Sequence, residues 1–160
     1  IFPAGPLRHS LKFVKDAQII LINGKKDIMF EEKLLQINND LSFFYSFYKP
    51  QNIDEFTNKK LIAIAGIGNP DNFFDLLNEN NLNVVKKFTY PDHYEFNQNE
   101  ISKLINESDK QNCQIITTEK DFYRVRKFKF DKLKYLKVKL EINEKEKLVN
   151  KIINYYDQNH

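Results

Sequence analysis

The chain has 160 residues, of which 41% are hydrophobic and 29% are charged, and its formal net charge is +3. That length can bury a hydrophobic core and predicts one domain, or one domain with part of another. No apolar run approaches the roughly 20 residues that a membrane-spanning helix requires. The single cysteine, Cys113, excludes an internal disulfide or a cysteine-based zinc cluster within the chain and favours a reducing, cytoplasmic compartment.

The first third of the chain is predicted to hold two strands. Residues 7–15 form a short helix or loop, and residues 16–24 form a buried strand that ends in an Asn-Gly turn. Aromatic side chains alternate over residues 41–48, a pattern typical of an extended strand, which Pro50 ends. Residues 51–60 are polar and form a connector, so a domain boundary is expected there. Because the chain begins without methionine and without the features of a signal peptide, we expect a piece of a longer protein.

The second part of the chain has a clearer alternation of strands and helices. A strand at residues 61–65 leads through a Gly-Ile-Gly turn to a helix, with Asn69 as its N-cap and Pro70 as its first residue. The next strand covers residues 84–88. The buried stripe of the helix between them is expected to consist of Phe73, Phe74, Leu76 and Leu77.

A second helix of this part is predicted after residue 96. Asn97 and Glu100 form a capping box at its start. Residues 114–116 then form a short strand, which runs into a short helix headed by residues 117–121. The side chains on the buried face of the capped helix are expected to be Ile101, Leu104 and Ile105.

The end of the chain is predicted to add one strand and one helix. Residues 136–140 alternate apolar and basic side chains, which indicates a half-exposed strand near a sheet edge. Asn143 and Glu146 cap the last helix. The side chains that this helix is expected to bury are Leu148, Val149, Ile152, Ile153 and Tyr156.

This alternation predicts a layered α/β domain with a largely parallel sheet and helices on both faces. Ligands of such sheets bind beyond the carboxyl ends of the strands. The loops that leave the strands there are residues 66–70, 90–94 and 117–121, so they are expected to share one rim.

The loop at residues 90–94 holds the most informative pair of side chains. Asp92 and His93 lie side by side between two tyrosines and next to a proline. Imidazole exchanges protons near neutral pH, so a histidine beside a carboxylate on a loop is a candidate for proton transfer or charge stabilisation. The alternative is a loop histidine that is hydrogen-bonded for structural reasons. The position on the ligand-facing rim favours the functional interpretation.

Phosphate-binding motifs are largely missing from the sequence. No Gly-x-x-x-x-Gly-Lys-Ser/Thr string occurs, and Asp71 stands where a dinucleotide fingerprint has its third glycine. Residues 117–121 offer two hydroxyls, a pair of carboxylates and an ammonium at a helix start, a place suited to an anion. The alternative for that segment is an N-cap with a salt bridge. The histidines, His9, His93 and His160, are too scattered to indicate a metal site.

Basic and aromatic residues are interleaved between Lys120 and Lys139. A solvated surface explains such a run, and an anionic partner is the alternative. The aromatic side chains would suit a phosphate-bearing ligand at a membrane surface or single-stranded nucleic acid. The basic residues are Lys120, Arg124, Arg126, Lys127, Lys129, Lys132, Lys134, Lys137 and Lys139, and the aromatic ones are Phe122, Tyr123, Phe128, Phe130 and Tyr135.

Four motifs in this order resemble the C-terminal half of the tetraacyldisaccharide 4'-kinase family, the lipid A 4'-kinases of Gram-negative bacteria. They are Pro3-Ala4-Gly5-Pro6-Leu7-Arg8, Ile64-Ala65-Gly66-Ile67-Gly68-Asn69-Pro70 with Phe73-Phe74, Tyr90-Pro91-Asp92-His93-Tyr94, and Thr117-Thr118-Glu119-Lys120-Asp121 followed by Arg124. The resemblance implies a kinase that moves the γ-phosphoryl group of ATP, with Mg²⁺, to the 4'-hydroxyl of a lipid-linked disaccharide phosphate. It also implies a peripheral enzyme at the cytoplasmic face of the inner membrane, with no nucleic acid partner.

The resemblance also implies a division into lobes. Residues 1–48 would be the tail of a P-loop NTPase-like N-terminal lobe, residues 49–60 a linker, and residues 61–160 a smaller three-layer α/β/α lobe. The lobe that holds ATP and Mg²⁺ would be mostly absent, so the fragment is expected to be inactive alone. A non-catalytic α/β module that binds an anionic ligand or RNA through residues 120–139 is the alternative.

The resemblance implies roles for single residues. His93 matches a histidine that pairs with a catalytic aspartate of the absent lobe, and His93 and its neighbour Asp92 are the expected catalytic residues of this chain. Contacts to substrate or phosphate are expected from Arg8, Thr117, Thr118, Lys120 and Arg124, with no metal ligands in this chain. The family usually has glutamate where His9 stands, which leaves the role of that position open.

Overall fold

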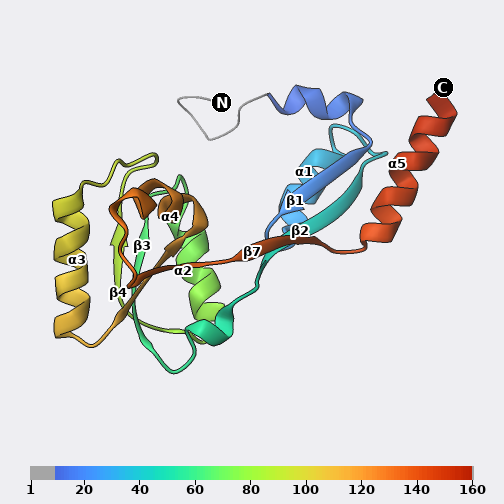
Figure 1. The fold of residues 1–160 in the computed structure, drawn as a ribbon. Helices are drawn as coiled ribbons and strands as arrows, with labels where there is room; N and C mark the ends of the chain where they lie inside the picture. The colour runs from blue at the N-terminus through green and yellow to red at the C-terminus, as the bar shows by residue number, and fades with distance from the viewer. Residues whose placement is uncertain (1–9, 160) are drawn as a thin grey trace. The chain divides into compact units, whose positions relative to one another are not determined.

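The structure, a computed structural model, describes residues 10–159. The chain divides into two compact units (Figure 1). One unit takes in the segments up to Tyr48 and from Leu140 onward, and the other spans Lys49–Lys139. The assignment of these units to the lobes of a kinase stays a prediction.

The unit at Lys49–Lys139 is built on a four-stranded, all-parallel sheet with the order β4-β3-β5-β6. The predicted α/β class with a parallel sheet is therefore confirmed. Its strands are β3 (Lys60–Ala65), β4 (Asn83–Thr89), β5 (Gln114–Thr118) and β6 (Leu133–Leu136), and its helices are α2 (Pro70–Glu79), α3 (Gln98–Lys110) and α4 (Glu119–Val125), with the short 3-10 helices η2 (Ile53–Glu55) and η3 (Arg126–Phe128).

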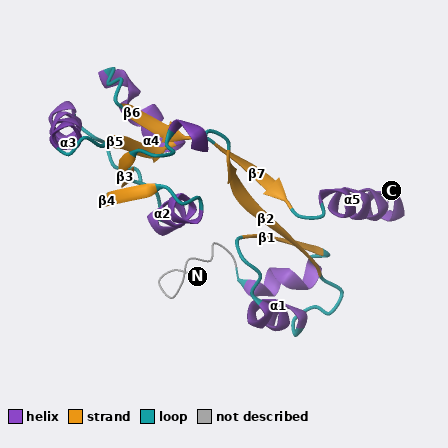
Figure 2. Cartoon of the chain, turned by 90° about the horizontal axis from the view of Figure 1, so that it is seen from below, coloured by secondary structure: helices purple, strands orange, loops and turns teal. Residues whose placement is uncertain are grey.

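Helices cover both faces of this sheet, and α2 and α3 lie on opposite sides of it in Figures 1 and 2. The apolar face of α2 packs against Leu61, Ala63 and Ala65 of β3, and α3 and α4 pack on the other face around Ile64 and Ile115. Every residue of β3 after Lys60 is buried, as expected for a central strand of a parallel sheet. The predicted stripe of α2 is confirmed at Phe73, Phe74 and Leu77, whereas Leu76 is only partly buried.

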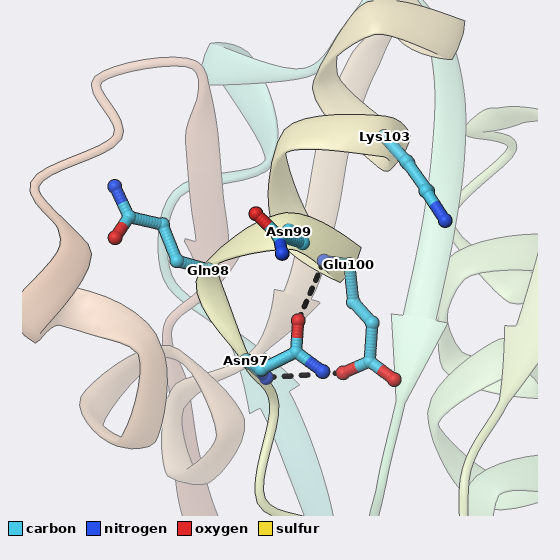
Figure 3. A pocket seen from close by; sticks show the side chains of 5 residues that line it. All are labelled: Asn97, Gln98, Asn99, Glu100 and Lys103. Carbon is cyan, nitrogen blue, oxygen red and sulfur yellow. Dashed lines mark hydrogen bonds between the residues drawn. The ribbon is translucent and has the colours of Figure 1, made fainter.

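The predicted helix starts differ in how they are capped. Asn97 and Glu100 form the predicted capping box of α3: Asn97 Oδ1 accepts from the Glu100 N–H at 2.9 Å, and Glu100 Oε2 accepts from the Asn97 N–H at 3.0 Å (Figure 3). At α2, Pro70 is the first residue as predicted, but the Asn69 side chain makes no cap bond. Proline has no N–H to satisfy there, which removes part of the need for a cap.

The other unit contains a small sheet of order β1-β2-β7, in which β1 and β2 are parallel. The predicted strands at residues 16–24 and 41–48 are both present, although the first is not buried as predicted, since none of its five residues is buried. The strands are β1 (Ile19–Asn23), β2 (Ser42–Pro50) and β7 (Val138–Ile142), and the helices are η1 (Leu11–Asp16), α1 (Ile28–Leu35) and α5 (Lys145–Asn159).

Two predictions for the end of the chain are wrong. The single strand expected at residues 136–140 is two strands, β6 and β7, in different sheets with Lys137 between them. The apolar face expected to be buried on α5 is buried only at Leu148, while Val149, Ile152, Ile153 and Tyr156 are exposed. A periodic apolar pattern indicates a face that can be buried, but burial also requires other apolar elements to cover it.

Candidate functional site

The predicted rim exists at the carboxyl ends of β3, β4 and β5. The helix after β3 packs on one face of the sheet and the helices after β4 and β5 on the other. The order in which successive strands are added to the sheet therefore reverses between the neighbouring strands β3 and β5. Open α/β sheets bind ligands at such a switch point. The loop after β4 joins the rim because the Tyr90 N–H donates to the Ala65 carbonyl at 2.8 Å.

His93 lies on this rim with its imidazole directed to solvent. Its side chain is 74% exposed, so it is not packed into the core. Its backbone is left-handed, with φ of +62°, a conformation that a non-glycine residue adopts at a cost. Two bonds hold the turn: Asp92 Oδ1 accepts from the His93 N–H at 2.9 Å, and the Pro91 carbonyl accepts from the Tyr94 N–H at 3.1 Å.

Two basic side chains flank Asp92. Its Oδ2 lies 3.7 Å from His93 Nε2, and its Oδ1 lies 3.5 Å from Lys120 Nζ at the start of α4. Loss of solvent contact by itself raises the pKa of Asp92, but the charges of His93 and Lys120 and the hydrogen bond from the His93 N–H outweigh it and lower the pKa below its usual value. The structure thus brings together Asp92, His93 and Lys120, as the shared rim predicts.

A buried polar cluster lies directly behind His93. Asp121 is 1% exposed, and its two oxygens accept from the Gly66 N–H, the Thr118 hydroxyl and Arg124 Nη1, at 2.8–2.9 Å. Arg124 Nη1 also donates to the Gly66 carbonyl at 2.9 Å, and Arg124 Nη2 lies 3.1 Å from His93 Nδ1. The cluster therefore connects the loop after β3, the start of α4 and the histidine loop.

The two threonines predicted to contact phosphate have hydrogen-bond partners within the protein. Thr117 is buried, and its hydroxyl donates to the Ile64 carbonyl at 2.8 Å. Thr118 is the N-cap of α4: its hydroxyl accepts from the Asp121 N–H and donates to the Asp121 carboxylate. A substrate phosphate would have to compete with these bonds. Arg8, also predicted to contact phosphate, lies outside the described residues.

Aromatic side chains connect the histidine loop to the hydrophobic core. Tyr90, Tyr94 and Phe96 contact one another with ring centroids 4.8–5.0 Å apart, and they belong to the core cluster that packs α3. The Tyr94 hydroxyl donates to Glu100 at 2.6 Å, which raises the pKa of Tyr94. Hydrogen bonds from the Asn97 N–H and then from Tyr94 lower the pKa of Glu100. The loop is thus tied to the first turn of α3.

The basic segment from Lys120 to Lys139 uses most of its rings for packing. Phe122, Phe128 and Phe130 are partly buried against the core, and Tyr135 lies against Phe122 with centroids 4.5 Å apart. Tyr123 is the large aromatic side chain of this segment that is exposed, and the Arg126 guanidinium lies over its ring. These contacts do not form the row of open rings on which single-stranded nucleic acid stacks.

Sequence reasoning did not identify the role of Asp121 or the close approach at Gly66. A Cβ added at Gly66 would lie 3.3 Å from Asp121 Oδ1, so the carboxylate uses the space that glycine leaves. The Thr-x-x-Asp spacing at residues 118–121 was the available signal for the cap, but no local pattern reveals that the carboxylate reaches Gly66.

Two further observations bear on ligands. Within residues 10–159, no group of three or more His, Cys, Asp or Glu side chains is placed to hold a metal ion. A hollow at the start of α3 is lined by Asn97, Gln98, Asn99, Glu100 and Lys103 (Figure 3). Its Asn97 and Glu100 groups are used by the capping box.

None of the helices in residues 10–159 has both the length and the apolar composition needed to span a bilayer.

The fold and the site define an α/β protein whose switch-point loops present an acid, an imidazole and an ammonium to solvent. The chain belongs to the tetraacyldisaccharide 4'-kinase family: a sequence model of that family, described as "Tetraacyldisaccharide-1-P 4'-kinase", matches residues 1–156. The predicted resemblance is therefore confirmed. No solved structure matches the chain.

Relatives from several bacteria support this membership. The chain is 33% identical to the tetraacyldisaccharide 4'-kinase of Pelagibacter ubique, with 98% of this chain and 51% of the relative covered. It is 35% identical to that of Rickettsia typhi, covering 95% and 46%, and 34% identical to that of Flavobacterium psychrophilum, covering 98% and 50%. The chain thus spans about half the length of the curated relatives it matches.

Proposed function

We propose that the protein to which this chain belongs transfers the γ-phosphoryl group of ATP to the 4'-hydroxyl of tetraacyldisaccharide 1-phosphate, a step of lipid A biosynthesis. Family membership over residues 1–156 supports the reaction. The observation that carries the proposal is the exposed imidazole of His93, held beside Asp92 on the ligand-binding edge of the sheet. The enzyme would work at the cytoplasmic face of the inner membrane, where a lipid-linked substrate is available.

The role proposed for His93 is to support removal of the hydroxyl proton. In the reaction the 4'-oxygen bonds to the γ-phosphorus, the bond to the ADP oxygen breaks, and the hydroxyl proton passes to a base. Phosphoryl transfer depends chiefly on positioning and charge neutralisation. A histidine that orients an aspartate base from the absent half of the enzyme is a suitable contribution, with Asp92 holding the turn and Lys120 able to face a substrate phosphate.

ATP and Mg²⁺ are proposed to bind mainly to the half of the relatives' length that this chain does not span. ATP supplies the phosphoryl group, and Mg²⁺ would neutralise its phosphate charge. The sequence here has no Gly-x-x-x-x-Gly-Lys-Ser/Thr string, so this chain is proposed to be inactive alone. Arg8 and Arg124 remain residues that we propose to contact phosphate.

The distribution of apolar side chains supports the proposed lobes. Among the described residues, eighteen of the twenty-two buried apolar side chains belong to the unit at Lys49–Lys139, and thirteen of the fifteen exposed large ones belong to the other unit. Large exposed apolar areas usually mark a surface that another element covers. We propose that the unit at Lys49–Lys139 contains most of the smaller α/β/α lobe, predicted to run over residues 61–160, and that residues 1–48 belong to the tail of a P-loop NTPase-like lobe. The division of the chain differs from that prediction after residue 139, because the residues from Leu140 onward belong to the same unit as the segment up to Tyr48.

A variant of His93 in the full-length enzyme tests the proposal. His93→Asn removes the imidazole while asparagine tolerates the left-handed backbone, so the turn is kept. We expect kcat to fall by roughly 10²- to 10⁴-fold, the usual contribution of a group that assists proton transfer, with little change in the KM for ATP. The measurement is transfer of labelled phosphate from ATP to the disaccharide lipid.

Glu95→Gln, an exposed change two residues along the same loop, is the matched control and should leave kcat unchanged. An unchanged kcat in His93→Asn would contradict the role of the imidazole. Product formation by the isolated chain would contradict the proposal that the ATP site lies elsewhere.

A further inference from the structure

We propose that Asp121 and Arg124 are positioning residues that determine which ring nitrogen of His93 carries the proton. The proposal concerns the resting state of the imidazole, and only its consequence for turnover rests on the proposed kinase function. Three layers of contacts run from the buried carboxylate of Asp121 to the exposed ring of His93.

The innermost layer is the carboxylate of Asp121, which three hydrogen bonds hold in place. It is 1% exposed. One oxygen accepts from the Gly66 N–H at 2.9 Å and from the Thr118 hydroxyl at 2.8 Å, and the other accepts from Arg124 Nη1 at 2.9 Å. The Gly66 N–H belongs to the loop after β3, and Thr118 is the N-cap of α4. Residues at the edge of the sheet therefore set the position of the carboxylate.

The middle layer is the guanidinium of Arg124. Its Nη1 is shared between Asp121 Oδ1 and the Gly66 carbonyl, both at 2.9 Å. The guanidinium is planar and rigid, so these two bonds also fix the direction of Nη2. That nitrogen lies 3.1 Å from His93 Nδ1. The Arg124 side chain is 21% exposed, and its contact with His93 lies at the exposed end of the guanidinium.

The outer layer is the imidazole. Arginine can only donate hydrogen bonds, so Nδ1 of His93 must be the acceptor and the ring proton must sit on Nε2. Nε2 lies 3.7 Å from Asp92 Oδ2 on the exposed side of the ring. His93 therefore presents an N–H, not a lone pair, to whatever approaches the rim, and it would meet a carboxylate of the absent half as a hydrogen-bond donor.

The tautomer can be measured in this chain without any assay of kinase activity. Long-range ¹H–¹⁵N NMR spectra of the histidine rings report which nitrogen is protonated, and the spectrum of His93→Asn identifies the signals of His93 among the three histidines. In the unmodified chain we expect neutral His93 to carry its proton on Nε2. A spectrum in which Nδ1 carries the proton would overturn the proposal, whatever the variants do.

The variant is Arg124→Lys, which keeps the positive charge but cannot make the forked set of bonds. We expect the ratio of the two tautomers to move toward Nδ1–H by roughly tenfold, a change that one hydrogen bond from a charged donor supports. Arg126→Lys is the matched control, because Arg126 is exposed and lies over Tyr123, 4.8 Å from the ring centroid. A ratio unchanged in Arg124→Lys would overturn the proposal.

Kinetics of the full-length enzyme separate this proposal from the proposed function. If both hold, Arg124→Lys lowers kcat with the KM for ATP unchanged, and Arg126→Lys does not. If the tautomer shifts but neither Arg124→Lys nor His93→Asn lowers kcat, the positioning role stands and the catalytic role of His93 fails. If His93→Asn lowers kcat while Arg124→Lys changes neither tautomer nor kcat, the positioning role fails.

Discussion

At the scale of single residues, the rim combines an exposed pair with a buried pair. Asp92 and His93 are open to solvent, whereas Asp121 and most of Arg124 are enclosed. Asp92 and His93 can contact a ligand. Asp121 and Arg124 hold the exposed pair in place through bonds within the protein, so no ligand is needed for that. His93 has a left-handed backbone in a turn that two hydrogen bonds hold, one from the His93 N–H to Asp92 Oδ1 and one from the Tyr94 N–H to the Pro91 carbonyl.

The carboxylate of Asp92 gives a prediction for pH. Because its pKa is lowered from the usual 3.8, NMR titration of its side chain should give a midpoint below that value. A group whose folded pKa is lowered contributes stability above its unfolded pKa and loses it as the pH falls through the folded pKa. The contribution of Asp92 should therefore be complete above about pH 4 and disappear below the measured midpoint.

Lys120→Met should raise the midpoint of Asp92, since it removes an ammonium 3.5 Å from the carboxylate. Lys127→Met serves as control, because that ammonium lies over the ring of Phe128 instead. A midpoint at or above 3.8 in the unmodified chain would show that the charges of His93 and Lys120 do not outweigh the loss of solvent.

At the scale of elements, the start of α3 connects helix stability to the histidine loop. Glu100 accepts from the Asn97 N–H through one oxygen and from the Tyr94 hydroxyl through the other. The capping box could be read directly from the sequence, because the bonds involve residues three apart. The Tyr94 contact could not, since it depends on how the loop from residue 90 folds back onto the helix.

Removing the cap should destabilise this part of the fold measurably. Asn97→Ala leaves the Glu100 N–H without its acceptor and should lower the free energy of unfolding by about 1 kcal/mol. Urea denaturation followed by circular dichroism measures the change. Asn99→Ala makes the same chemical change on an exposed position of the same turn and should alter stability by less than about 0.5 kcal/mol; equal effects of the two would argue against the cap.

At the scale of the whole molecule, the two units differ in how many of their apolar side chains are buried. Both hydrophobic core clusters identified among residues 10–159 lie within Lys49–Lys139. The other unit has a three-stranded sheet and α5, but many of its large apolar side chains are exposed. A unit with so little buried apolar area gains little stability from the hydrophobic effect.

This contrast predicts that residues 49–139 fold alone. The isolated segment should unfold in urea in one cooperative transition, and His93 should keep the same ring tautomer as in the full chain. The segment comprising residues 1–48 is the control and should show no cooperative transition by itself. A segment 49–139 that lacks a cooperative transition would mean that its core requires the other unit.

Much of the fold could be predicted because it is encoded locally. The strands at residues 61–65 and 84–88, the starts of α2 and α3, and the position of the rim follow from periodicity, caps and the parallel order of strands. The predicted gathering of residues 90–94 and 117–121 is confirmed for the same reason, since parallel strands all end on one edge. The resemblance that identified the family rested on four motifs, three of which include loops of this rim.

Burial and long-range contact depended on the tertiary structure. The residues from 133 to 142 divide between two sheets, and α5 keeps most of its apolar face exposed, because a sequence pattern states which face can be covered but not whether anything covers it. The same limit applies at the site. By itself the sequence determined which loops meet at the rim. Only the tertiary structure decided that Arg124 meets His93 and Gly66, residues 31 and 58 positions away, because side chains so far apart are brought together by the packing of three strands and not by any local preference.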